Sequence, residues 1–198
     1  MPDPAYTHPR SIARADAPLA APETEGGAVD PEPPERLSVT VVAEDGDWAG
    51  VENLEAKLGR AADALARHLR LPGAGHASIV LGSDVMVQGL NRAYRGKDAP
   101  TNVLSFPYQA RPGADAQDDG YLGDIVLAAE TVAREATERG IPIAQHAQHL
   151  AVHGLLHLLH YDHQTDAEAE AMEQVERNVL AALGIADPYA ADPNETDD

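Results

Sequence analysis

Three histidines that lie close together in the sequence could bind a metal ion. His153 and His157 are four residues apart, so on a helix with about 3.6 residues per turn their rings share one face and can reach a common point. His163 follows six residues later, past the expected end of that helix, where a turn could bring its ring to the same point. Three nitrogen ligands leave the fourth tetrahedral position of a Zn²⁺ open for water, which is typical of catalytic rather than structural zinc.

The spacing of these histidines matches the metzincin signature H-E-x-x-H-x-x-G-x-x-H, but two landmark residues differ. Gly154 stands where a peptidase of that class has its general-base glutamate, which counts against proteolysis. His160 stands in place of the turn glycine, and histidine tolerates a left-handed backbone better than bulky or branched residues do. The turn that brings in the third ligand is therefore possible but strained. A His-rich helix that is buried for structural reasons is the alternative for this stretch.

Three motifs, in this order, resemble the YbeY family of metal-dependent bacterial endoribonucleases of ribosomal RNA maturation. They are YRGKDAPTNVLSFP at residues 94–107, YLGDIVLA at residues 121–128 and HGLLHLLHYDH at residues 153–163. The resemblance implies an α/β fold, one Zn²⁺ per chain held by His153, His157 and His163, and an arginine in the cleft at Arg95. It departs from the family at His160, where the family usually has glycine.

The resemblance also implies a function and partners. It implies a single-strand-specific endoribonuclease that acts in rRNA processing and in ribosome quality control, on RNA of the small ribosomal subunit and with ribosomal proteins as further partners. Arg95 and the three histidines form the expected catalytic set. Either a water activated by the metal or the ribose 2′-hydroxyl could be the nucleophile.

A short basic cluster could bind the phosphates of such a substrate. It contains Arg92, Arg95 and Lys97. With the resemblance, Arg95 is the best candidate, because its planar guanidinium offers a fork of donors that suits a phosphate group. Without the resemblance, a solvated arginine at a helix end is the simpler interpretation. Ser105 could contact the substrate backbone, although ordinary strand polarity explains it more simply.

The composition limits the partners and the compartment. The chain has 14 Lys and Arg against 33 Asp and Glu, a net charge of −19, whereas RNA binding neutralises phosphates with basic residues. Acidic surface farther away than about 8 Å is screened at physiological salt, so a local basic cleft can still bind RNA. The absence of cysteine excludes thiolate ligands and disulfides. No stretch reads as a membrane span or a signal peptide, so a cytoplasmic protein is expected.

The chain is expected to fold as one α/β domain between two tails. A disordered, acidic and proline-rich extension is expected at residues 1–36, and a disordered acidic tail at residues 188–198. The endoribonuclease domain is expected to span residues 37–187. Strands are expected at 37–43, 77–81, 102–106 and 122–128, and helices at 54–69, 83–95, 130–140, from 141 through the first two ligands, and from 165 to 184. A surface loop at 111–120 joins the last two strands. This pattern favours a mixed four-stranded sheet with one antiparallel pair, about five helices and a zincin-like metal helix.

Other polar residues near the motifs have two possible roles each. His149 lies one turn before His153 and could support that ligand or be a partly exposed polar residue, and an exposed role is expected for His146. Asp162 could fix the tautomer of a ligand or close the turn. Asp124 could mark the edge of a cleft, or protect an edge strand from aggregation.

Three functions from different classes fit these observations. The first is the metal-dependent endoribonuclease that the resemblance implies. The second is a ribosome-assembly or RNA-binding factor in which the metal is mainly structural. The third is a zinc peptidase, which the glycine at position 154 disfavours.

Overall fold

The computed structural model describes residues 37–71, 75–109 and 120–190. In these ranges the chain forms nine elements, in the order β1 (Ser38–Ala43), α1 (Leu54–Leu69), β2 (His76–Gly82), α2 (Asp84–Arg95), β3 (Val103–Pro107), β4 (Tyr121–Ala128), α3 (Ala129–Glu138), α4 (Ile143–Leu158) and α5 (Asp166–Ala182). The predicted α/β fold with four strands and five helices is confirmed. The predicted extension at residues 1–36 and nearly all of the predicted loop at 111–120 lie outside the described residues.

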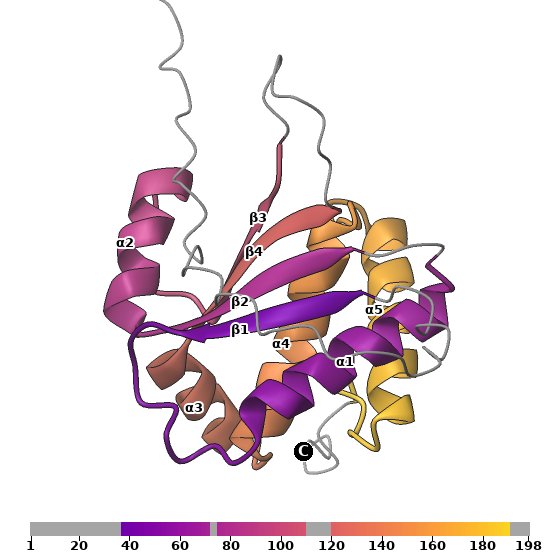
Figure 1. Cartoon of the computed structure of the whole chain (residues 1–198), viewed down its shortest axis with the longest axis horizontal. Coiled ribbons are helices and arrows are strands. Elements are labelled where there is room, and N and C mark those ends of the chain that lie inside the picture. Colours follow the sequence, from indigo (N-terminus) through magenta and orange to yellow (C-terminus); the bar gives the residue numbers. More distant parts are fainter. Residues whose placement is uncertain (1–36, 72–74, 110–119, 191–198) are drawn as a thin grey trace, which may run out of the picture.

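The four strands in the described part of the chain form one mixed sheet in the order β1-β2-β4-β3 (Figure 1). β2 pairs in parallel with both β1 and β4, while β3 runs antiparallel to β4. The predicted antiparallel pair of the third and fourth strands is therefore confirmed. Because β4 lies inside the sheet, the interpretation of Asp124 as an edge-strand charge is wrong. Its carboxylate instead accepts a hydrogen bond from the Tyr121 hydroxyl at 2.5 Å.

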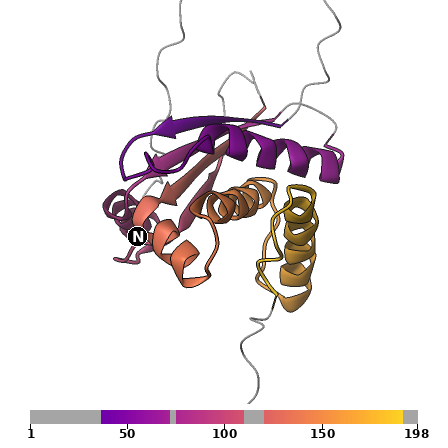
Figure 2. The same ribbon diagram turned by 90° about the horizontal axis from the view of Figure 1, so that it is seen from below.

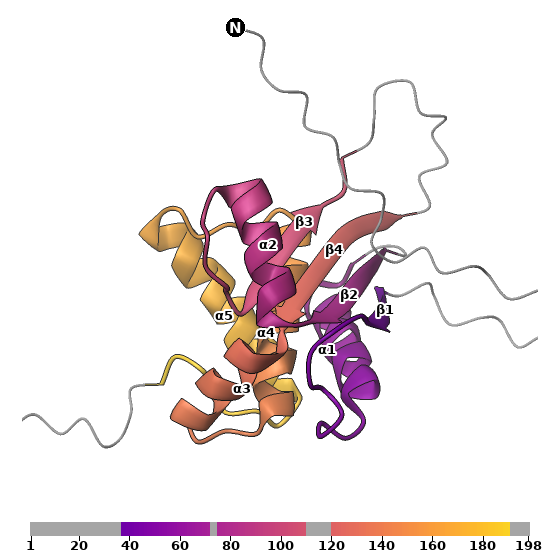
Figure 3. The ribbon, with the colours of Figure 1, turned by 90° about the vertical axis from the view of Figure 1, so that its left-hand side faces the viewer.

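The two faces of the sheet are covered by different helices. On one face, residues such as Ile79 and Ile125 pack against α1 and α4. On the other face, Val80 and Val126 pack against Val87 of α2. Successive side chains of a strand point to opposite faces, so α2 and α4 lie on opposite sides of the sheet (Figure 3).

Helix α4 is the central helix of its layer. It lies between α3 and α5 (Figure 2) and also contacts α1, β3 and β4. Its buried residues include Ala147, Leu150, Ala151 and Leu155. A helix that is packed on most sides must satisfy its polar side chains inside the protein, because an unpaired buried polar group is costly. The buried histidines of α4 therefore need hydrogen-bond partners from the elements packed around this helix.

Sequence signals at the helix ends act as expected. The Ser83 side chain accepts a hydrogen bond from the Met86 backbone N–H, and Gly96 ends α2 with a φ of 68°. Thr165 and Glu168 form the predicted capping box of α5.

None of the helices in the described ranges is long and apolar enough to cross a bilayer.

Candidate metal centre

His153, His157 and His163 come together at the C-terminal end of α4. One ring nitrogen from each lies within 4.8 Å of the other two. The ring centroids are 4.7 Å apart for His153 and His157 and 5.1 Å apart for His157 and His163. The first two side chains are half-buried and the third is exposed, so the cluster reaches the surface of the protein.

The third ligand is brought in by a turn that starts at His160. The φ of His160 is 66°, which is the left-handed conformation that the signature glycine would adopt. The His160 backbone N–H donates to the carbonyl of His157 at 3.0 Å, and the N–H of Tyr161 donates to the carbonyl of Leu156 at 2.9 Å. The chain therefore makes the turn with histidine in the place of glycine, as predicted.

Asp162 closes the same turn. One carboxylate oxygen accepts a hydrogen bond from the His163 backbone N–H at 2.8 Å, and the other accepts from the Gln164 side chain at 2.6 Å. The His163 backbone N–H, followed by the Gln164 side chain, lowers the pKa of the Asp162 carboxyl. Of its two predicted roles, the structure supports the one in the turn.

Replacing His160 with glycine should stabilise the protein by up to about 1 kcal/mol. A non-glycine residue held in the left-handed region costs about 1–3 kcal/mol, and the greater freedom of glycine in the unfolded chain takes back part of the gain. Urea unfolding of the zinc-free protein measures the difference. The matched control is Gly184→Ala, at a φ of 73° with open space around the added Cβ, which should lose stability. A His160→Gly variant less stable than the wild type would contradict the assignment of strain.

The hydrogen bonds of the two helical ligands determine where their protons lie. His153 Nδ1 is 2.9 Å from a carboxylate oxygen of Glu176, and His157 Nδ1 is 3.1 Å from the backbone carbonyl oxygen of Tyr161. Both oxygens can only accept, so each Nδ1 carries a proton, and in the neutral form of each ring Nε2 keeps its lone pair. Burial, followed by the neighbouring His153 and His163, lowers the pKa of His157, which favours the neutral ring that a metal requires.

This arrangement fits a metal ion. The Nε2 atoms of His153 and His157 are 3.1 Å apart. With both protons on Nδ1, two lone pairs face each other at that distance and cannot hydrogen-bond. A cation that accepts both lone pairs, together with a nitrogen of His163, would remove the conflict. Three imidazole nitrogens are suitable ligands for Zn²⁺.

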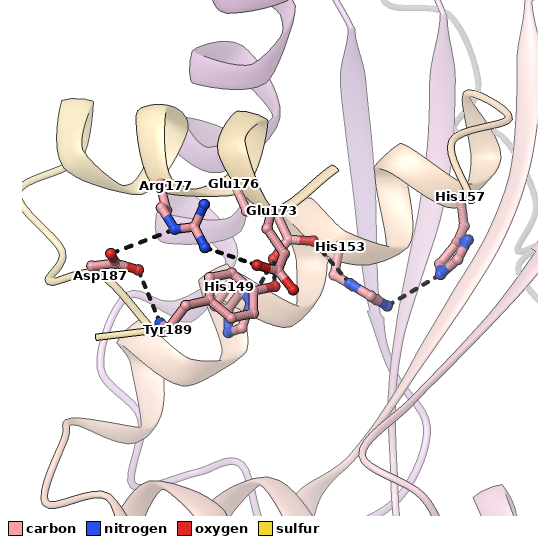
Figure 4. Close-up of polar contacts among 8 residues, drawn as sticks. All are labelled: His149, His153, His157, Glu173, Glu176, Arg177, Asp187 and Tyr189. Atoms are coloured by element: carbon pink, nitrogen blue, oxygen red, sulfur yellow. Dashed lines mark hydrogen bonds and ion pairs between the residues drawn. The ribbon is translucent and has the colours of Figure 1, made fainter. Parts of the chain in front are cut away.

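Glu176 of α5 is a buried residue of the site that was not predicted from the sequence. Its side chain has no exposed surface and accepts hydrogen bonds from His153, from His149 and from the Tyr189 hydroxyl (Figure 4). Burial alone would raise the pKa of Glu176, but the three donors lower it to about 2. The carboxylate is therefore ionised at neutral pH.

The two histidines that precede the cluster on α4 are buried. The predicted exposure of His146 is therefore wrong, and of the alternatives for His149 the partly exposed one does not hold. Their relative exposures are 1% and 9%. His146 Nε2 lies 2.7 Å from the Glu135 carboxylate, and His149 Nε2 lies 2.8 Å from that of Glu176. Both Nδ1 atoms are buried with no hydrogen-bond partner in the described part of the chain. Each ring is therefore neutral with its proton on Nε2, since a buried N–H without a partner would be costly.

The C-terminal segment reaches the site through Tyr189. Its backbone N–H donates to Asp187 at 2.9 Å, and Asp187 in turn forms an ion pair with Arg177 at 3.5 Å. Tyr189 lies two residues after the predicted domain end at residue 187 and still contacts Glu176, and that boundary stays a prediction. Residues 191–198 of the predicted acidic tail lie outside the described residues.

Gly154 allows α4 to pack closely against β4. A Cβ at this position would lie only 2.9 Å from Cγ2 of Ile125. The position that carries a glutamate in metzincins therefore faces the sheet rather than the three histidines. Packing thus explains why this chain has glycine there.

Both a family model and individual proteins of known family are similar to this chain. The family model for endoribonuclease YbeY matches residues 43–184. The chain belongs to the YbeY family. Endoribonuclease YbeY of Parvibaculum lavamentivorans is 46% identical over 162 residues, which cover 79% of this chain and 86% of that protein. Endoribonuclease YbeY of Rhodopseudomonas palustris is 50% identical over 149 residues, which cover 72% of this chain and 76% of that protein.

A solved structure also resembles this YbeY-family chain. It is a solution structure of a Thermotoga maritima protein, with 23% sequence identity and a TM-score of 0.46. The likeness covers 81% of this chain and 99% of that one.

The predicted basic cluster, which includes the Arg95 that the YbeY resemblance implies, belongs to a different helix from the histidines. Arg92, Arg95 and Lys97 are exposed at the C-terminal end of α2, which packs on the face of the sheet opposite α4. Arg92 forms an ion pair with Asp98 at 3.5 Å. Within the described ranges, no hydrogen bond or ion pair joins Arg95 or Lys97 to the three histidines.

Ser105 lies nearer to the metal helix. It is on the edge strand β3, opposite Ile125 of β4. Residues paired across two strands share a face, and Ile125 packs towards Gly154 of α4. Ser105 is half-buried and therefore lies on the α4 face, on the edge strand beside the candidate metal centre.

Proposed function

We propose that this chain is a metal-dependent endoribonuclease that cleaves single-stranded ribosomal RNA during processing and quality control of the small ribosomal subunit. The proposed metal is Zn²⁺, one per chain, held by His153, His157 and His163. The observation that carries the proposal is the 3.1 Å approach of the Nε2 atoms of His153 and His157 beside a third imidazole. Membership in a family named for endoribonuclease activity supports RNA as the substrate.

The chain's own residues would prepare this site in two ways. Glu176 and the Tyr161 carbonyl hold the Nδ1 protons of the two helical ligands, so both rings present lone pairs. The exposed ring of His163 leaves one side of the cluster accessible to a substrate. A bound Zn²⁺ would supply a water of lowered pKa and would polarise a phosphoryl oxygen.

The basic cluster and Ser105 would bind the RNA backbone in this proposal. An RNA held by both Arg95 and the metal centre would pass around the β3 edge of the sheet, because α2 and α4 lie on opposite faces. Ser105 is on that edge strand. Arg92 and Lys97 would add phosphate contacts, which compensates locally for the net charge of −19.

Replacing Arg95 with alanine should reduce cleavage by about 100-fold or more and leave zinc content unchanged. Removing one preorganised donor to developing charge costs about 10²–10³ in rate, and Arg95 does not contact the ligands. Cleavage of single-stranded rRNA and elemental analysis measure the two effects. Arg67→Ala, which removes an exposed arginine of α1, is the matched control and should cleave normally. Undiminished cleavage by Arg95→Ala would remove this residue from the proposed site.

Two observations bear on the alternative functions. A closed structural zinc site usually has four protein ligands, whereas the cluster found in the described ranges has three and reaches the surface. This favours catalysis over an assembly factor with a structural metal. The close approach of Gly154 to Ile125 leaves no room for a peptidase glutamate at that position. We place the enzyme in the cytoplasm, with ribosomal RNA and ribosomal proteins as its partners.

A further inference from the structure

We propose that Glu176 is a positioning residue that fixes the tautomer of His153, and that Tyr189 of the C-terminal segment anchors Glu176 in turn. The inference rests on the proposed metal site, and it assigns to α5 and the segment after it a role in metal binding.

The two oxygens of Glu176 have different partners. One accepts from His153 Nδ1 at 2.9 Å. The other accepts from His149 Nε2 at 2.8 Å and from the Tyr189 hydroxyl. The two donors on one oxygen, His149 and Tyr189, hold the carboxylate in place. The other oxygen is thereby directed at His153 and needs no second donor to orient it. Figure 4 shows Glu176 between the two histidines.

Loss of this acceptor would let His153 close the site. A neutral imidazole carries its proton on either nitrogen, and hydrogen bonds decide which. If the proton moved to Nε2 of His153, that atom could donate to His157 Nε2, which lies at hydrogen-bond distance, 3.1 Å away. The two ligands would then bind each other instead of a metal. The Glu176 carboxylate keeps the proton on Nδ1 and so keeps the lone pairs available.

Tyr189 is itself held by several contacts. The Arg177 guanidinium lies 5.0 Å from the centre of its ring, and Asp187 accepts from its backbone N–H. Burial and the neighbouring Glu176 carboxylate raise the pKa of Tyr189, so the hydroxyl keeps the proton that it donates. The segment after α5 therefore acts on His153 through Glu176.

The same helix contains a matched pair that does not touch a ligand. His146 is buried, as His149 is, and contacts the partly exposed Glu135 carboxylate at 2.7 Å. Glu135 also accepts from the Asn102 amide at 2.9 Å. Weakening this pair tests the general cost of disturbing a buried His–Glu contact on α4, without changing the partner of a ligand.

The experiment compares Glu176→Gln, Tyr189→Phe and Glu135→Gln with the wild type. Zinc affinity is measured by chelator competition, and the tautomer of His153 by ¹⁵N NMR of its ring in the zinc-free proteins. Glu176→Gln should bind zinc about 10- to 100-fold more weakly, because a glutamine amide offers one acceptor atom to three donors. Its His153 should shift towards the Nε2-protonated form. Tyr189→Phe should change both readouts in the same direction by less, and Glu135→Gln should change neither.

Each outcome decides the proposal. Wild-type affinity and tautomer in Glu176→Gln, or an equal loss of affinity in Glu135→Gln, would overturn it. If circular dichroism shows Glu176→Gln to be unfolded, Tyr189→Phe decides, and an unchanged His153 tautomer in that variant overturns the proposal. If the wild type binds no zinc, the proposed function fails, while the ring NMR of the zinc-free proteins still shows whether Glu176 sets the tautomer.

Discussion

Replacing His157 with alanine should abolish both zinc binding and RNA cleavage while the protein stays folded. The substitution removes one of two facing Nε2 atoms and leaves two ligands, which are too few for a stable zinc site. Losing several kcal/mol of transition-state stabilisation reduces cleavage by on the order of 10³-fold. The His157 side chain is only half-buried, so the fold should tolerate its removal. Elemental analysis and cleavage of single-stranded rRNA, run on the variant and the wild type, measure the two effects.

The control for this substitution is His68→Ala, which removes an exposed histidine of α1 and should keep both properties. Measurements of RNA binding and circular dichroism on His157→Ala distinguish the endoribonuclease with a catalytic metal from the assembly factor with a structural metal. Loss of cleavage with RNA binding and fold retained supports catalysis, whereas unfolding supports the assembly factor with a structural metal. Wild-type protein that is folded, free of metal and active on RNA would contradict the proposed metal dependence.

Replacing Gly154 with alanine should destabilise the protein, although alanine is normally the better helix former. In an open helical position, the change from glycine to alanine gains about 0.5–1 kcal/mol. Here the new Cβ would lie 2.9 Å from Cγ2 of Ile125, a fully buried β-branched residue of an interior strand that has little room to move. Forcing an extra methyl group into a packed core costs about 1–3 kcal/mol, so a net loss is expected. Gly154→Glu should be far worse, because it also buries an unpaired charge.

Thermal and urea unfolding of the zinc-free variants test this prediction. The matched control is Gly59→Ala in α1, where an added Cβ meets no atom within 4 Å, and this variant should be more stable than the wild type. Peptidase assays on Gly154→Glu should show no activity. Equal stabilisation by Gly154→Ala and Gly59→Ala would show that the contact with Ile125 does not limit the packing of α4.

Local signals account for most of what could be predicted from the sequence. The ligand histidines follow from helical spacing plus a turn, and the left-handed His160 occupies the place of a glycine in a known signature. The bounds of α2 follow from Ser83 and Gly96, whose capping roles depend only on neighbouring residues. The antiparallel pairing of β3 with β4 could be predicted because a loop, rather than a helix, joins those two strands.

The burial of His146 and His149 and the role of Glu176 depend on contacts between segments that are distant in the sequence. The polar stripe of His146 and His149 looks like an exposed face, and only the packing of α3 and α5 against α4 shows that carboxylates meet it inside the protein. Glu176 lies on the apolar face of α5, four residues from both Met172 and Leu180, which are buried. An acid at such a position is a usable signal for a buried partner. Nothing in the sequence indicates which residue that partner is.

The three histidines of the proposed metal site, in the described part of the chain, lie within residues 153–163, so an unfolded chain would still keep their imidazoles close together and would retain part of the affinity for zinc. A bound metal stabilises a fold only by the difference between its affinities for the folded and unfolded chains. Zinc should therefore raise the unfolding temperature by less than its affinity for the native protein implies. Glu176 meets His153 only in the folded chain, and the thermodynamic coupling between zinc and folding should depend largely on that one contact.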